Sequence, residues 1–153
     1  VEVVVSGGTL LGAVRDGRFA GRPSDVDIRV MGTYEEARKF ASILQTSYQH
    51  FLYHREHVDR IQLLFCPKLF PTRLRVRSGF LLDIEFTTKD SNKTAWDENS
   101  KHVGPVMTDH WTTHGGLVAS IFDCQVLVPD QWEEYLIQVY GADWQTPRRN
   151  PLV

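Results

Sequence analysis

The sequence lacks the features that mark membrane proteins, duplex nucleic-acid binders and disulfide-rich domains. No apolar run reaches the roughly 18 residues that a membrane span needs, so we expect no span within this chain. Its 17 basic residues are outnumbered by 19 acidic ones, without the positive excess of a duplex nucleic-acid binder, so we expect no nucleic-acid partner. Cysteine is scarce: Cys66 and Cys124 could pair, but their spacing matches no zinc ribbon or redox motif, and two buried thiols are the more common outcome.

Internal repeats and low-complexity segments are absent as well, and what remains is the composition of one globular domain. A chain of 153 residues with 42% hydrophobic side chains is long enough for one sizeable core and too short for two. It opens at Val1, inside an expected strand and without an initiator methionine. We therefore expect residues 1–153 to form a single domain that is a piece of a longer protein.

Hydrophobic periodicity predicts an α+β fold built on a mixed β-sheet with flanking helices. The expected strands are apolar or alternating runs bounded by turn residues, at 1–5, 25–30, 51–54, 60–65, 74–76 and 80–86. The expected helices are a short one over 9–15 and two longer amphipathic ones, at 33–48 and 130–140. A capping box begins each of the longer helices, with Thr33 and Glu36 in the first and Asp130 and Glu133 in the second. The strands from 51 to 86 leave little room for helices between them, which favours a mainly antiparallel or mixed sheet.

Two carboxylates in the strand at 25–30 are the strongest functional signal. In the run Asp25-Val26-Asp27-Ile28, alternate side chains leave the same face of the strand, so Asp25 and Asp27 project together while the apolar residues turn inward. Two adjacent negative charges repel each other unless a cation lies between them. Hard carboxylate oxygens select Mg²⁺ or Mn²⁺ over softer metals.

A second acidic strand supports the metal site. In the run FLLDIEF at 80–86, Asp83 and Glu85 share one face of a strand that is hydrophobic enough to be central in its sheet. A buried carboxylate needs a partner, and a cation shared with Asp25 and Asp27 would supply one. The alternative is an edge strand whose acidic face lies in water.

Glycines precede the first acidic strand at a point where backbone could approach a ligand. Gly7 and Gly8 open the short helix, and Thr9 follows them. Backbone amides and a hydroxyl at a helix N-terminus favour anions, so these three residues are expected to bind phosphate.

Taken in order, these segments resemble the LicD and fukutin family of phosphotransferases, which have a nucleotidyltransferase fold. The resemblance rests on SGGTLLGAVR at 6–15, PSDVDI at 23–28, LDIEF at 82–86 and a closing YGADWQTP at 140–147. Many family members carry further aspartates before the D-x-D strand, whereas this chain has Arg-Pro-Ser at 22–24, so donor preference stays open.

The resemblance implies transfer of a phosphorylated alcohol, such as phosphoribitol, phosphoglycerol or phosphocholine, from a CDP-activated donor to a glycan hydroxyl. Asp25, Asp27 and Asp83 would be the catalytic residues and would hold Mg²⁺ or Mn²⁺, with Asp83 either a metal ligand or the general base. Arg15, an arginine that the family motif shares, would make a phosphate or structural contact near the site. The compartment would be the Golgi or ER lumen in a eukaryote and the cytoplasm in a bacterium.

Two other functions stay open at this point. The same metal site could move a nucleoside monophosphate from a nucleoside triphosphate to a small acceptor, or the fold could serve as a non-catalytic glycan-binding module. Trp96 and Trp111 lie in polar segments and could stack on a base or sugar ring, although packing in the core explains either tryptophan as well.

Overall fold

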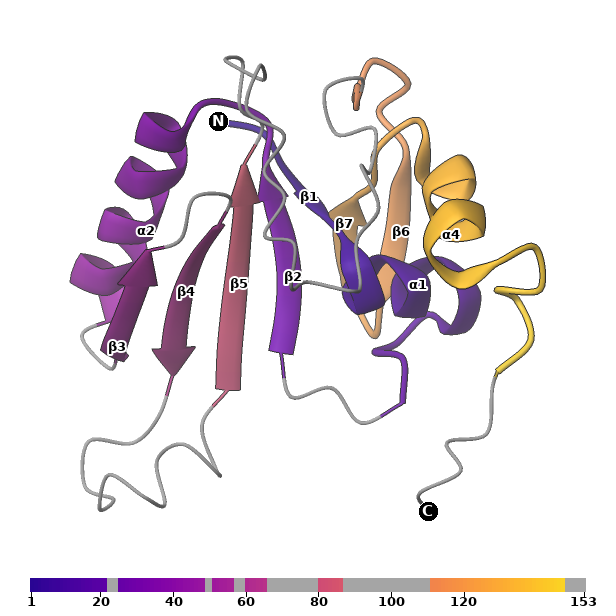
Figure 1. Ribbon diagram of the computed structural model, residues 1–153, viewed down its shortest axis with the longest axis horizontal. Helices are drawn as coiled ribbons and strands as arrows, with labels where there is room; N and C mark the ends of the chain where they lie inside the picture. The colour runs from indigo at the N-terminus through magenta and orange to yellow at the C-terminus, as the bar shows by residue number, and fades with distance from the viewer. Residues whose placement is uncertain (22–24, 49–50, 57–59, 66–79, 87–110, 148–153) are drawn as a thin grey trace, which may run out of the picture.

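A computed structural model describes residues 1–21, 25–48, 51–56, 60–65, 80–86 and 111–147 of the chain. These residues form three helices and two small β-sheets, an α+β arrangement as the sequence predicts (Figure 1). The helices are α1 (Gly7–Asp16), α2 (Tyr34–Tyr48) and α4 (Trp132–Tyr140). The strands are β1 (Val3–Val5), β2 (Asp25–Val30), β3 (Phe51–Glu56), β4 (Arg60–Phe65), β5 (Phe80–Phe86), β6 (Val118–Ile121) and β7 (Cys124–Leu127). No helix among the described residues combines the length and the apolar character that crossing a bilayer requires.

The larger sheet is mixed and has five strands in the order β1-β2-β5-β4-β3. β2 and β5 run parallel, and the other neighbouring pairs run antiparallel. β5 therefore lies in the middle of the sheet, between β2 and β4. The second sheet is the hairpin of β6 and β7.

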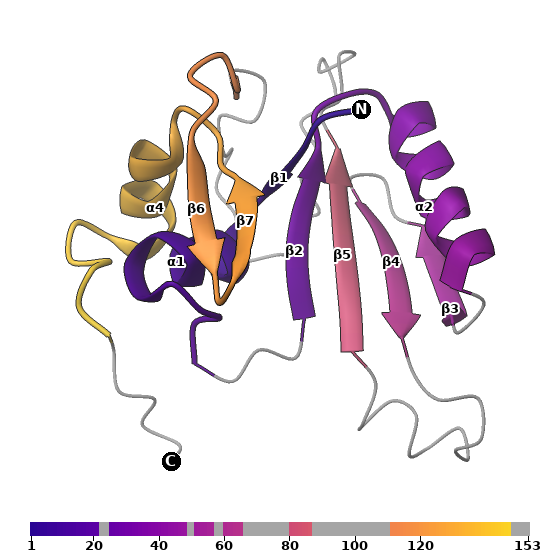
Figure 2. The same ribbon diagram turned by 180° about the vertical axis from the view of Figure 1, so that it is seen from behind.

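The buried hydrophobic residues of the described part of the chain form two cores. α2 covers one face of the large sheet, where Ala37 and Ala41 pack with inward-facing residues of β2, β4 and β5 such as Val30, Ile61 and Ile84. The second core joins α1, α4, the hairpin and β1. Figures 1 and 2 show α2 toward the β3 end of the large sheet, and α1, α4 and the hairpin gathered at the other end, beyond β1 and β2.

Local signals explain where α2 begins and where α1 ends. The predicted capping box of α2 is confirmed: Thr33 N–H donates to Glu36 Oε2 at 2.7 Å, and Glu36 N–H donates to Thr33 Oγ1 at 3.4 Å. α1 ends at Asp16, and the C-cap residue Gly17 has the left-handed backbone (φ 64°) that is typical of this position.

The predicted capping box of α4 is wrong. The residue at the N-cap is Gln131, without a side-chain cap hydrogen bond. Asp130 instead accepts hydrogen bonds from Thr112 Oγ1 at 2.6 Å and from Gly115 N–H at 3.0 Å, so its carboxylate holds the preceding segment rather than the helix. A long-range contact has replaced the local one that the sequence favoured.

Other sequence predictions have mixed outcomes. Cys124 is exposed, so a buried thiol at that position is wrong. The first strand begins at Val3 and is shorter than expected. Cys66, Trp96 and the strand predicted at 74–76 lie outside the described residues.

Candidate metal centre on the acidic face of the sheet

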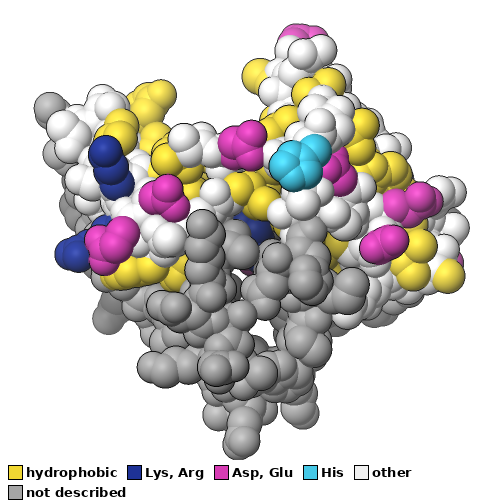
Figure 3. Space-filling view, turned by 90° about the horizontal axis from the view of Figure 1, so that it is seen from above, with side chains coloured by type: hydrophobic (Ala, Val, Ile, Leu, Met, Phe, Trp, Pro, Cys, Tyr) yellow, Lys and Arg dark blue, Asp and Glu magenta, His cyan; other side chains and the backbone are white. Residues whose placement is uncertain are grey.

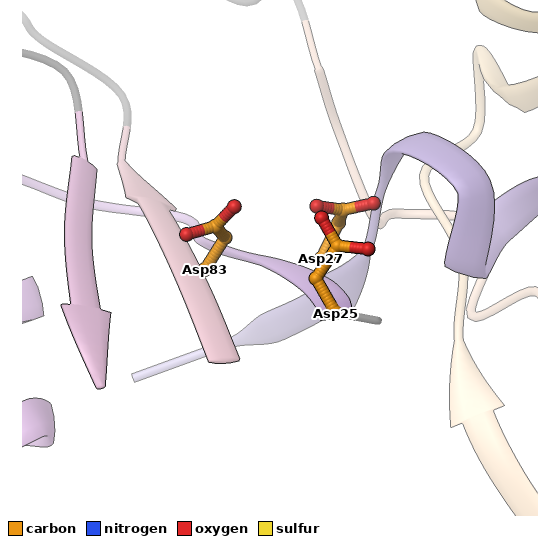
Figure 4. Close-up of side chains that lie close together, drawn as sticks. All are labelled: Asp25, Asp27 and Asp83. Atoms are coloured by element: carbon orange, nitrogen blue, oxygen red, sulfur yellow. The ribbon is translucent and has the colours of Figure 1, made fainter. Parts of the chain in front are cut away.

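The parallel pairing of β2 with β5 brings the three predicted aspartates together. Asp27 lies directly opposite Asp83 in the register, and Asp25 is two residues before Asp27 on the same face of β2. One carboxylate oxygen from each of the three residues lies within 4.8 Å of the other two. Figure 4 shows Asp25 and Asp27 side by side on β2, with Asp83 across from them on β5.

Asp83 is the most buried of the three. Its exposed fraction is 5%, and the strand that carries it is central, so the alternative of an edge strand with an acidic face in water does not apply. Gln62 lies opposite Asp83 on β4, and its side-chain amide donates a hydrogen bond to Asp83 Oδ1 at 2.7 Å. Sequence reasoning missed Gln62, although a lone amide within the apolar run RIQLLF was a signal for it.

Asp27 is held in place by the start of α1. Gly8 N–H donates to Asp27 Oδ2 at 3.1 Å, and the backbone N–H of Asp27 donates to Thr9 Oγ1 at 2.9 Å. Gly7 lies so close that a Cβ atom built on it would stand 2.4 Å from Asp27 Oδ2, and its φ of +49° is in the left-handed region. The glycines therefore allow the helix N-terminus to meet the carboxylate directly.

The three residues that we expected to bind phosphate thus have contacts within the protein. Gly7 N–H donates to the phenol oxygen of Tyr135 on α4 at 3.1 Å, while Gly8 and Thr9 bind Asp27. These contacts position the acidic site. A phosphate contact by the same residues stays a prediction.

The environment of Asp27 disfavours its charge. The pKa of Asp27 is raised to about 7, by burial first and then by the neighbouring charges of Asp25, Glu85 and Asp83, while the hydrogen bond from Gly8 opposes the rise. A cation shared by the carboxylates would relieve both the burial cost and the repulsion. Within the described part of the chain the donor set consists of three carboxylates, and such hard oxygen ligands fit Mg²⁺ or Mn²⁺.

A tyrosine from the closing segment faces the same cluster. The pKa of Tyr140 is raised to about 12, by burial first and then by the charges of Asp27 and Asp25. Its phenol is therefore protonated at neutral pH and can act as a hydrogen-bond donor beside the acidic groups. The sequence indicated Tyr140 only as a helix-face residue and part of the closing motif.

Arg15 lies at the end of α1 and makes structural contacts. Its guanidinium pairs with Asp16 at 2.7 Å and donates to the backbone carbonyl of Trp144 at 3.4 Å, which ties α1 to the closing segment. The hydrogen bond to Asp16 raises the pKa of Arg15 and lowers that of Asp16. A phosphate contact by Arg15 also stays a prediction.

Trp111 packs in the core. Its exposed fraction is 6%, and its ring meets that of Tyr135 edge-on, with centroids 5.0 Å apart. Of the two explanations for Trp111, packing therefore accounts for it.

Viewed from above, the surface is hollowed between the side that carries α2 and the side that carries α4, with acidic side chains on both sides of the hollow (Figure 3).

Comparison of the chain with models of protein families finds no match, and comparison with curated proteins finds none either. The resemblance to the LicD and fukutin family therefore rests on the motifs, and the geometry of the acidic face has to be interpreted chemically.

Proposed function

We propose that the chain is a metal-dependent phosphotransferase of the LicD and fukutin type, with a nucleotidyltransferase-like fold. It would transfer a phosphorylated alcohol from a CDP-activated donor to a hydroxyl group of a glycan. The observation that carries the proposal is the convergence of Asp25, Asp27 and Asp83, from two strands, to within 4.8 Å at their carboxylate oxygens. Metal-assisted phosphate chemistry is the reaction class that needs such a cluster of hard oxygen ligands.

The three aspartates would hold Mg²⁺ or Mn²⁺. When bound, the ion would neutralise charge on the donor diphosphate and on the leaving cytidine monophosphate. The chain's own residues prepare that site: Gly8 N–H fixes one oxygen of Asp27, and Gln62 fixes one oxygen of Asp83. Groups held in this way lose little freedom when the substrate binds.

The proposed reaction needs only the donor and the acceptor. The acceptor hydroxyl oxygen forms a bond to the phosphorus that carries the alcohol, and the bond from this phosphorus to the bridging oxygen breaks, releasing CMP. The hydroxyl proton passes to a carboxylate oxygen. Asp83 serves either as that base or as a ligand of the cation, and both roles use its position opposite Asp27.

The first experiment screens for the donor. The chain is heated with Mg²⁺ and CDP-ribitol, CDP-glycerol or CDP-choline, because a ligand that binds the native state raises the melting temperature. The stabilising donor is then incubated with candidate glycans, and the products are identified by mass spectrometry. Release of CMP supports the proposal, whereas release of pyrophosphate from a nucleoside triphosphate would assign the chain to nucleotidyl transfer.

Substitution of the aspartates tests the site itself. Asp25→Ala and Asp27→Ala should abolish transfer while the chain stays folded, with Glu134→Ala, an exposed carboxylate on α4, as the control. Near-normal transfer by either aspartate variant would show that the assignment of that residue is wrong. If calorimetry detects no metal-dependent binding of any CDP donor, a glycan-binding module becomes the better explanation.

A further inference from the structure

A charged pair lies beside the three aspartates on the same face of the sheet. Arg29 follows Asp27 by two residues on β2, and Glu85 follows Asp83 by two residues on β5. Arg29 and Glu85 are opposite each other in the register, as Asp27 and Asp83 are. The face thus carries two neighbouring cross-strand pairs, one of like charge and one of opposite charge.

Arg29 is held firmly against its partner. Its exposed fraction is 7%, and its NH2 group lies 2.8 Å from Glu85 Oε2. On the other side, the guanidinium carbon stands 4.5 Å from the centroid of the Trp111 ring, and Trp111 in turn packs against Tyr135. A buried indole therefore fixes the position of the positive charge.

The pair is not optimal for stability alone. The Nε atom of Arg29 is buried and has no hydrogen-bond partner among the residues that the structure describes. An unsatisfied buried donor lowers the stability of a fold, and a buried ion pair often contributes less than an apolar pair of the same volume. A functional role in addition to packing would explain an arginine at this position.

The position of Glu85 beside the aspartates indicates what this role is. Glu85 is on the acidic face about 7 Å along the strand from Asp83, its side chain is one methylene longer than that of aspartate, and it is partly exposed. Without Arg29, its carboxylate would be released to turn toward a cation held by the aspartates as a fourth oxygen ligand. A site with more carboxylates suits Ca²⁺, which accepts more oxygen ligands than Mg²⁺ does.

We propose that Arg29 is a positioning residue that withholds Glu85 from the cation, so that the site offers three carboxylates and selects Mg²⁺ or Mn²⁺ over Ca²⁺. This inference rests on the proposed metal site and specifies how the site selects its cation. Arg29 acts through Glu85 and touches neither substrate nor ion.

The test is a double-mutant cycle on Arg29 and Glu85, in which calorimetry measures the affinity for MnCl₂, MgCl₂ or CaCl₂ alone. Arg29→Met keeps much of the apolar stem but removes the charge, and it should bind cations more tightly, by about tenfold or more from Coulomb's law, with the largest gain for Ca²⁺. Glu85→Gln leaves the charge of Arg29 uncompensated and should weaken binding of all three ions. The double variant should return to within about threefold of the unmodified chain.

The distinguishing result is a larger gain for Ca²⁺ than for Mg²⁺ in Arg29→Met that the double variant loses, because loss of the positive charge alone would tighten binding of all three divalent ions alike and loss of a merely structural contact would weaken it. Equal weakening, or no change in either, would overturn the role of Arg29. If Arg29→Met fails to fold in a thermal melt, Glu85→Gln still decides, since unchanged or tighter binding there contradicts the proposal. Asp25→Asn identifies a different failure: if it binds Mn²⁺ as the unmodified chain does, the metal centre and the proposed function fall together.

Discussion

Asp27→Asn should stabilise the metal-free protein at alkaline pH, although it removes a residue that we place in the active site. The amide is nearly the same shape as the carboxylate, and its oxygen can still accept the hydrogen bond from Gly8 N–H. The substitution removes the charge that burial and the neighbouring carboxylates oppose. Sites that bind ions commonly carry such a cost in the absence of the ion.

The magnitude follows from the pKa of Asp27, which is about 7 in the fold against an ordinary value of 3.8. A carboxyl group whose pKa is raised in the fold contributes stability that is fully present at a pH below its ordinary pKa of 3.8. This contribution is lost as the pH rises through 3.8 to about 7. One pKa unit corresponds to about 1.36 kcal/mol. The raised pKa of Asp27 therefore destabilises the fold by about 4 kcal/mol at pH 8, and by roughly half of that or less at pH 5. The stability advantage of Asp27→Asn should therefore grow by roughly 2 to 3 kcal/mol between pH 5 and pH 8.

Urea unfolding in EDTA, followed by tryptophan fluorescence at the two pH values, measures this difference by linear extrapolation. Asp123→Asn, the same chemical change at an exposed position in the β6–β7 turn, is the control and should show no comparable growth. Adding Mg²⁺ should stabilise the unmodified chain and leave Asp27→Asn unaffected. A variant that is less stable than the unmodified chain at pH 8, or a difference independent of pH, would refute the reasoning.

Three further substitutions, one of them with a matched control, test the site and the core that supports it. Gly7→Ala should destabilise the fold by about 1 to 3 kcal/mol and abolish Mn²⁺ binding in calorimetry, because its Cβ would stand 2.4 Å from Asp27 Oδ2 at a φ of +49°. Gly8→Ala is its matched control: the nearest atom would be 3.9 Å away, so Mn²⁺ affinity should be kept, and loss of binding there would contradict the steric explanation. Tyr135→Phe removes the acceptor for Gly7 N–H and should cost about 1 to 2 kcal/mol in urea unfolding; no cost would mean that this hydrogen bond does not hold α1 to α4. Leu136→Ala empties a fully buried position of the second core and should cost about 2 to 5 kcal/mol, whereas a cost below 1 would show that α4 packs loosely.

The local features of this protein could be predicted from the sequence. The alternation in DVDIRV placed Asp25 and Asp27 on one face of a strand, and the β2 boundaries agree with the prediction. The capping box of α2 was predictable for the same reason, since both partners lie within one turn. Such signals depend on residues a few positions apart, where backbone geometry alone decides which side chains meet.

The remaining features depend on contacts between distant segments. The failed cap at Asp130 shows this most clearly, because Thr112 and Gly115 bind the carboxylate that local rules assigned to α4. Nothing near Trp111 in the chain indicated that its ring would lie against Arg29. Competition between a local partner and a tertiary one is settled only when the chain folds.

By itself, the sequence indicated the three helices, the strands β2 and β5 and the acidic face that each of these strands carries, but it did not indicate the hairpin of β6 and β7. Only the tertiary structure decided that β2 and β5 are neighbours with Asp27 opposite Asp83, and that Arg29 therefore meets Glu85. The physical reason is that strand order and register arise from packing of the whole sheet against its two cores. Periodicity specifies which face a residue occupies, but not which strand lies beside it.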